Sequence, residues 1–170
     1  MIMRQFNNVG DLELKEVVVS IRKVNKVSKG GRKFHFSVFV VVGDGNGNVG
    51  YGLGKGNEVN EAASKGVLRA KNNLIHVNIL HGTLPHEVIG KHGCNVVLLK
   101  PATDGTGIKA GGGVRVVCKQ MGISNVISKC IKGRNINNAV KATFDALKTI
   151  STPIEVAKLR NVSLDKLFNK

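Results

Sequence analysis

Tryptophan is absent from this 170-residue chain, whose aromatic residues are six phenylalanines and one tyrosine. The core must therefore be built mainly from valine, isoleucine, leucine and alanine. No apolar run approaches the ~20 residues of a membrane-spanning helix, so we expect no membrane partner. The first residues, MIMRQFNN, lack the apolar centre of a signal peptide, which predicts a cytoplasmic protein.

Cysteine is also scarce, because only Cys94, Cys118 and Cys130 are present and no two of them form a C-x-x-C pair. We interpret all three as buried, reduced thiols rather than as a disulfide framework or a metal site. The histidines form no H-x-x-x-H or H-E-x-x-H pattern. The sequence thus predicts neither a metal nor a cofactor.

Acidic residues are few. The chain has 11 aspartates and glutamates and 26 lysines and arginines, which gives a net charge of +15. On a compact domain this charge favours a polyanionic partner, nucleic acid before anionic membrane. The few acids form no recognisable acid/base pair, and nothing local activates a cysteine, so we do not expect an enzyme.

Between Val17 and Gly43 the chain has no acid at all, and this stretch carries the densest positive charge. The Gly-Gly pair predicts a turn between two strands, because glycine tolerates positive φ. A basic hairpin of this kind can enter an RNA groove and neutralise phosphates. The candidate RNA-binding residues of the hairpin are Arg22, Lys23, Lys26, Lys29, Gly30, Gly31, Arg32 and Lys33.

The first half of the chain alternates as β-strands do, with Val17, Val19 and Ile21 on one face. A second alternation runs through Phe34, Phe36, Val38, Val40 and Val42. Phe34 and Phe36 share a face, so we expect core positions before base-stacking platforms. Asp44–Gly47 predicts another hairpin turn, followed by a third strand through Leu53.

A helix is expected from an N-cap near Asn57 to about Asn73. Its apolar face comprises Val59, Ala62, Ala63, Val67 and Ala70. Lys65 and Arg69 lie four residues apart on another face and, with Lys55, extend the set of candidate RNA-binding residues. The first half is therefore a β-β-β-α unit.

The second half predicts a two-layer α/β domain. Strands are expected over 75–80, 86–91, 95–99 and 125–131. Helices are expected over 114–121, from Ile136 to Leu147 with an end before Pro153, and from Ser163 towards Phe168. The chain divides into a flexible segment over 1–14, a first domain over 15–74 and a second over 75–170.

Two glycine-rich segments resemble nucleotide-binding loops but do not meet all the requirements of the known motifs. Gly45, Gly47 and Gly50 fit G-x-G-x-x-G, but a strand follows and no acid stands about twenty residues later. We interpret the glycines of the whole stretch Gly43–Gly56 as turn and bulge positions. The stretch Gly105–Gly113 precedes a helix, and its backbone N–H groups could meet an RNA phosphate or a neighbouring protein. The sequence does not separate these two alternatives.

Several motifs in order resemble the bacterial-type family of small-subunit ribosomal protein five. They are Lys29–Arg32, Val41–Gly47, Val49–Gly52 with Gly54-Lys55, His81–Leu84, Pro101-Ala102, Gly105–Gly107 and Ala110–Gly112. The resemblance runs from about residue 15 to 165. It implies a double-stranded-RNA-binding-like first domain, followed by an α/β domain common among ribosomal proteins.

The resemblance further implies a structural role in the small ribosomal subunit and docking on its rRNA. It places the protein near the path along which mRNA enters, beside the fourth and eighth proteins of that subunit, with an influence on translational accuracy. The residues expected to face the fourth protein are Gly105, Thr106, Gly107, Gly112 and Arg115. A free-standing RNA-binding regulator and a small nucleotide-dependent enzyme are the alternatives.

Overall fold

The computed structural model describes residues 13–163, which form an N-terminal and a C-terminal sheet with helices packed on them. The N-terminal sheet has the order β1 (Lys15–Ser28), β2 (Gly31–Gly43), β3 (Asn48–Gly56) and β4 (Ile75–His76), all antiparallel. Helix α1 (Val59–Asn72) packs on one face of this sheet. The expected β-β-β-α unit is confirmed.

The second sheet has the order β5 (Val88–His92), β6 (Asn95–Pro101), β8 (Val126–Lys132) and β7 (Ile108–Lys109). Strands β7 and β8 are parallel, and α2 (Gly112–Met121) connects them. Helix α3 (Ile136–Lys148) packs against β5 and β6, and α4 (Pro153–Arg160) follows it. The expected α/β domain is confirmed.

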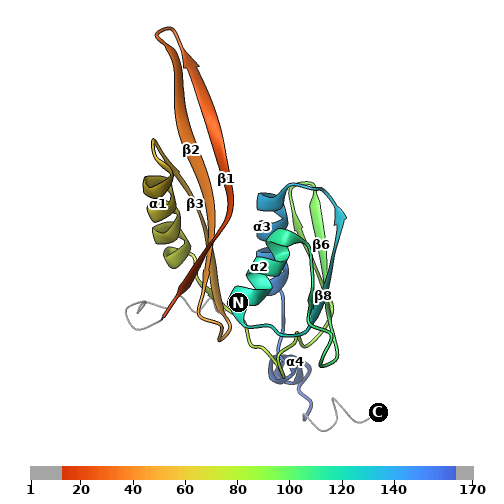
Figure 1. Ribbon diagram of the computed structural model, residues 1–170. Helices are drawn as coiled ribbons and strands as arrows, with labels where there is room; N and C mark the ends of the chain where they lie inside the picture. Colours follow the sequence, from red (N-terminus) through yellow and green to blue (C-terminus); the bar gives the residue numbers. More distant parts are fainter. Residues whose placement is uncertain (1–12, 164–170) are drawn as a thin grey trace.

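The elements stack in four layers, which Figure 1 shows from left to right as α1, the first sheet, α2 with α3, and the second sheet. Strand β2 is buried on both faces: Val38, Val40 and Val42 pack towards α1, whereas Phe39 and Val41 pack towards the second half. A strand covered on both sides needs apolar residues at every position. This explains the uninterrupted run from Val38 to Val42.

The two halves share one core. The Tyr51 ring of β3 stacks on Phe39, with ring centroids 5.8 Å apart, and meets Phe144 of α3 edge-on at 4.6 Å. Burial raises the pKa of the Tyr51 hydroxyl above its ordinary value. The Gly45 and Gly47 N–H groups donate to the carbonyls of Gln120 and Met121 at the end of α2. The first sheet is therefore held firmly against the second half.

The glycines of β3 correct one expectation. Gly45 and Gly47 do occupy the turn, with φ of +76° and +95°. Four later glycines, however, lie in a regular strand and face α1: Gly50, Gly52, Gly54 and Gly56. A Cβ on Gly54 would stand 1.8 Å from the Ala62 carbonyl oxygen. These residues let the helix lie directly on the strand and are not bulge positions.

The start of α1, the end of β4 and one additional strand differ from expectation. Helix α1 has Glu58 at its N-cap, and the Asn57 N–H instead donates to the Glu61 carboxylate at 3.0 Å. The strand expected over 75–80 stops at His76, because its partner β3 begins at Asn48, which pairs with His76. The chain then turns through His81 and Gly82, both at positive φ. A short strand, β7, forms within the glycine-rich stretch.

Pro153 was expected only to end a helix, but it also begins one. It occupies the first turn of α4, where Thr152 and Glu155 form a reciprocal capping box. The helix expected beyond Ser163 lies outside the described residues. The end of α3 before Pro153 is confirmed.

The cysteines are not uniformly buried. Cys118 of α2 is buried, and this burial raises its pKa to about 12. Cys94 is exposed in the turn between β5 and β6, and Cys130 of β8 is half-buried against the shared core. Only Cys118 therefore matches the expectation of a buried thiol.

Candidate nucleic-acid interface

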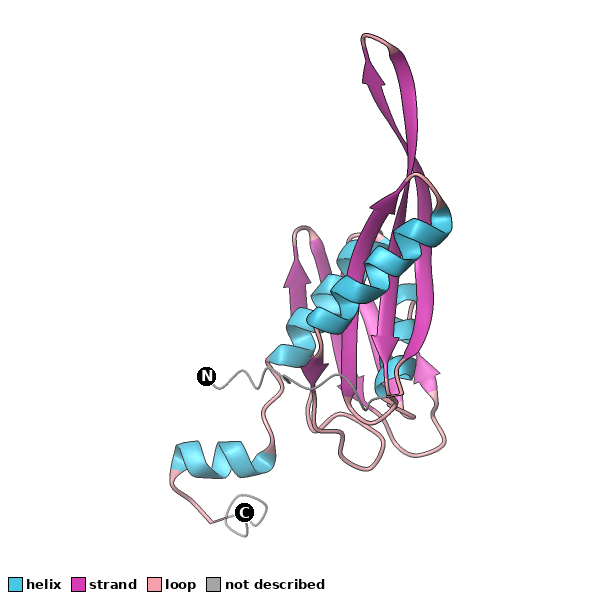
Figure 2. Ribbon diagram, turned by 90° about the vertical axis from the view of Figure 1, so that its left-hand side faces the viewer, coloured by secondary structure: helices cyan, strands magenta, loops and turns pink. Residues whose placement is uncertain are grey.

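The β1–β2 hairpin projects beyond the body of the molecule as an arm, here defined as residues 22–36 (Figures 1 and 2). The pairing of β2 with β3 ends at Phe36 and Gly56, whereas β1 and β2 stay paired to Ser28 and Gly31. Residues 24–28 and 31–35 thus form a two-stranded ribbon that no third strand supports. Gly31 at the tip has a φ of +115°, as the turn required.

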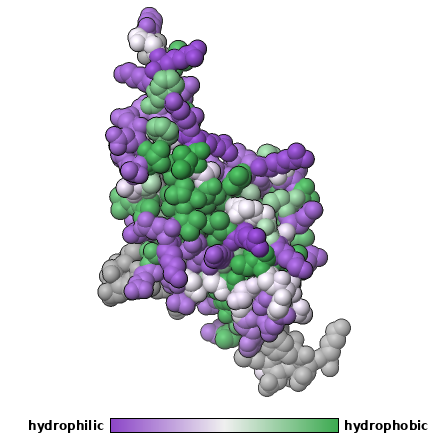
Figure 3. All heavy atoms as spheres, viewed as in Figure 1, coloured by the Kyte–Doolittle hydropathy of each residue, from purple (hydrophilic) through white to green (hydrophobic). Residues whose placement is uncertain are grey.

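Positive side chains occupy both faces of the arm. Lys26 lies opposite Lys33 on one face, and Arg22 shares that face two pairs away. Lys23 and Arg32 project from the other face, because side chains alternate along a strand. Hydrophilic residues surround the tip in the space-filling view (Figure 3). The arm can therefore contact phosphates on either side.

The arm carries uncompensated charge. Within residues 13–163, no ion pair involves any of its six lysines and arginines. The facing pair Lys26 and Lys33 is destabilising for an isolated ribbon, because like charges directly opposite repel. An RNA phosphate placed between them would relieve this repulsion.

A groove lies between the base of the arm and the start of α1. It is lined by Lys26 and His35 from the arm, Lys55 from β3, and Glu61 and Lys65 from α1. The fold thus brings together three candidate residues that are distant in sequence: Lys26, Lys55 and Lys65.

The α1 candidates differ in availability. Lys65 is paired with Glu61, and this hydrogen bond, together with the one from the Asn57 N–H, holds the pKa of the Glu61 carboxyl below its ordinary value. The Lys65 charge is therefore partly neutralised. Arg69 does not line the groove, and its guanidinium donates to the Leu53 carbonyl oxygen. Three candidates lie outside the arm: Lys55, Lys65 and Arg69. Within the described part of the chain, Lys65 has an ion pair and Arg69 a hydrogen bond, whereas neither is found for Lys55.

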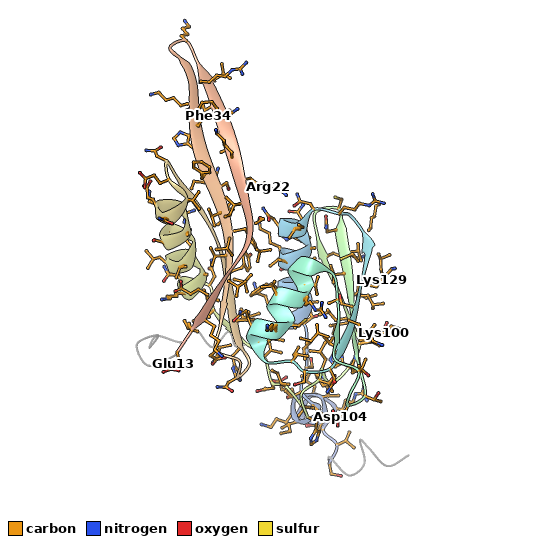
Figure 4. The ribbon with its side chains drawn as sticks, in the orientation of Figure 1. Glu13, Arg22, Phe34, Lys100, Asp104 and Lys129 are labelled. Carbon is orange, nitrogen blue, oxygen red and sulfur yellow. The ribbon has the colours of Figure 1, made fainter. Side chains whose placement is uncertain are left out.

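The expected protein-facing residues lie apart from the arm, on the loop around Asp104 and the start of α2 (Figure 4). Gly105 and Gly107 have φ of +84° and +68°, and no atom lies within 4 Å of a Cβ built on either. Gly112 is equally open, and the Arg115 guanidinium donates to the Ile108 carbonyl at 3.0 Å. The loop therefore presents bare backbone on the surface.

Asn125, which shapes this loop, was not predicted from the sequence. The buried Asn125 accepts a hydrogen bond from the Gly107 N–H through Oδ1 and donates through Nδ2 to Asp104, each at 3.0 Å. Thr83 Oγ1 donates to the Asn125 carbonyl at 2.7 Å. No local pattern marks this cluster, because its members are 18 to 42 residues apart.

A second basic surface was also missed. The outward face of the second sheet carries Lys91, Lys129 and Lys132 as exposed residues, and Lys129 points away from the body in Figure 4. Lys100 on the same sheet pairs with Glu87 at 3.1 Å. These lysines are spread over three strands, so no local charge run marked them.

No group of three potential metal ligands occurs within residues 13–163. No helix in that range is long and apolar enough to cross a membrane.

Comparison with known proteins gives a consistent result. The family model for ribosomal protein S5, N-terminal domain, matches residues 14–78, and that for its C-terminal domain matches residues 90–160. Small ribosomal subunit protein uS5 of Porphyromonas gingivalis is 46% identical, with 98% of this chain and 97% of the relative covered.

The uS5 protein of Syntrophobacter fumaroxidans is 52% identical, with 88% of this chain and 90% of the relative covered. The uS5 protein of Salinibacter ruber is 51% identical, with 89% of this chain and 87% of the relative covered. These relatives are components of the ribosome and not enzymes, so the expectation of a non-enzymatic ribosomal protein is confirmed. The chain belongs to the ribosomal protein S5 family.

Proposed function

We propose that this chain is a structural constituent of the small ribosomal subunit in the cytoplasm that binds small-subunit rRNA through its basic arm. The adjoining groove extends the rRNA contact through Lys55, with a smaller part for Lys65. The loop at Gly105–Gly107 and the start of α2 contact the neighbouring fourth protein. Through these contacts, and one with the eighth protein, the chain supports subunit assembly and translational accuracy near the path of incoming mRNA.

The arm carries this proposal. An exposed ribbon of like charges with no ion pair to the rest of residues 13–163 gains nothing for folding, but it can neutralise RNA phosphates. A protective role against edge-to-edge aggregation would require only one or two lysines. The base of the arm is anchored in the shared core, which fixes the direction in which the arm projects.

Replacing both Lys26 and Arg32 with alanine is expected to weaken binding to small-subunit rRNA. The plot of log affinity against log salt concentration should flatten by ~1–2 units, because two phosphate contacts no longer release counterions. The measurement is filter binding at several KCl concentrations, with co-sedimentation with small subunits in high salt as a second readout.

The matched control is the variant Lys148→Ala with Lys158→Ala, which loses the same charge far from the arm, in exposed positions. Its salt dependence is expected to equal that of the wild type. Equal flattening in both variants would show that net charge, and not the arm, determines binding.

The loop makes a separate prediction. Gly107→Leu is expected to weaken the contact with the fourth protein and to change miscoding, while rRNA affinity stays close to wild type. Gly107→Ala is the control, because it imposes the same backbone strain at φ +68° with far less bulk. Affinity for the purified fourth protein and a miscoding reporter give the readouts. Normal assembly and unchanged accuracy in the leucine variant would exclude the interface role.

A further inference from the structure

Phe34 is exposed on the arm, contrary to the expectation of a core position. Its relative exposure is 50%, and within residues 13–163 every other phenylalanine or tyrosine is buried or half-buried in a core. Phe36, two residues along the same face, packs against the α1 cluster, the group of buried residues that β2 and α1 form together: Val38, Val40, Val42, Ala62 and Ala70. The two phenylalanines, which look equivalent in the sequence, thus have different environments.

The fold does not require a phenylalanine at this position. Phe34 lies opposite Asn25, where the ribbon has no third strand and no helix against it (Figure 4). A threonine or valine would suit a two-stranded ribbon equally well. The ring instead leaves apolar area in water, on a face that also carries the charged Lys23 and Arg32 and the exposed Val27.

A cation accompanies the ring. The Lys23 ammonium lies over Phe34, 4.3 Å from the ring centroid. A protein surface that binds unpaired nucleotides combines these two groups, because the aromatic ring stacks on a base and the cation attracts the adjacent phosphate. The cores of protein–protein interfaces are depleted in lysine, so the lysine beside this ring favours a nucleic-acid partner over an apolar protein.

We propose that Phe34 is a stacking platform for an unpaired base of the rRNA, and that Lys23 binds the phosphate next to that base. The inference rests on the proposed function of the arm and adds the kind of RNA element that the arm recognises. It requires a bulged or looped nucleotide, because bases inside a regular RNA duplex are not accessible to a ring.

The test uses the full-length chain and small-subunit rRNA. Phe34→Leu retains an apolar side chain but loses the aromatic face, so rRNA affinity is expected to fall roughly 5- to 100-fold. Phe34→Trp is expected to bind at least as tightly as the wild type. Since the chain contains no tryptophan, this variant has a single indole, and its fluorescence should be quenched when a base stacks on it.

Val27→Ala is the matched control, because Val27 is a 72% exposed apolar residue on the same face of the arm. Its affinity should not change. The proposal is overturned if Phe34→Leu binds as the wild type does, or if the indole emission of Phe34→Trp shifts to the blue without quenching, as burial against a protein would produce. If the variant with both Lys26 and Arg32 replaced loses binding while Phe34→Leu does not, the arm binds rRNA but Phe34 does not stack on a base. Unchanged binding in the Lys26 and Arg32 variant would reject the arm's rRNA role itself.

Discussion

Replacing Gly54 with valine is expected to lower the free energy of unfolding by at least about 3 kcal/mol. A Cβ at this position would lie 1.8 Å from the Ala62 carbonyl oxygen and 2.6 Å from the Gly66 nitrogen. Both atoms belong to the backbone of α1, so no side chain can rotate away. The whole helix would have to lift from β3.

Displacement of α1 would disrupt more than the contact at Gly54. Ala62 and Ala70 are fully buried between α1 and the sheet, and a displaced helix would expose both, together with the Val40 side chain beneath Gly66. For a chain of this length, a loss of 3 kcal/mol corresponds to a fall in melting temperature of roughly 6–12 °C. Thermal unfolding followed by far-ultraviolet circular dichroism measures it.

Gly112→Ala is the control for this prediction. Gly112 opens α2, and no atom lies within 4 Å of a Cβ built on its backbone, so its replacement should change stability by less than about 0.5 kcal/mol. A Gly54→Val protein that melts with the wild type would show that α1 is not held against β3 in solution.

Local patterns predicted most of the fold because most of it depends on local alternation. Val38, Val40 and Val42 share a face in the sequence and share the α1 cluster in the structure. Val114, Val117, Cys118 and Met121 were expected on one side of a helix, and all four are buried in α2. The division of the chain near residue 74 remains a prediction, because the two halves share a continuous core.

Features that depend on distant contacts could not be predicted. The stripe from Gly50 to Gly56 follows period two, as a strand does, but its purpose is evident only once α1 is seen against it. Phe34 and Phe36 have equivalent patterns, and only the end of β3 at Gly56 separates them. The Ser20 hydroxyl donates to Asn137, 117 residues away, and no local signal marks such a pair.

The candidate site shows the same division. The arm's residues are contiguous, so charge and the Gly-Gly turn were enough to identify them. Lys55 and Lys65 meet Lys26 only through the packing of α1 and β3 against the arm's base. For the loop at Gly105–Gly107, the glycines were recognisable, whereas Asn125, which binds the Gly107 N–H, and Thr83, which binds Asn125, were not.

Asn125→Asp is expected to release the Asp104–Gly107 loop. The native amide accepts from Gly107 and donates to Asp104 at the same time, which a carboxylate cannot do. The variant would place two carboxylates at hydrogen-bonding distance from each other, and their repulsion would move the loop away. We expect amide hydrogen exchange at Thr106 and Gly107 to accelerate at least about tenfold, since a buried polar group loses its partner.

The double variant Asn125→Asp with Asp104→Asn should reverse this effect, because it exchanges the two groups and leaves the hydrogen bond with its direction inverted. Asp104→Asn alone should have little effect, since an amide oxygen at position 104 still accepts from Asn125. The four proteins form a cycle whose coupling energy is expected to be about 1–2 kcal/mol. If the double variant exchanges as fast as Asn125→Asp, the hydrogen bond to Asp104 does not hold the loop. If it recovers slow exchange and binding to the fourth protein together, the loop's shape is what the neighbouring protein requires.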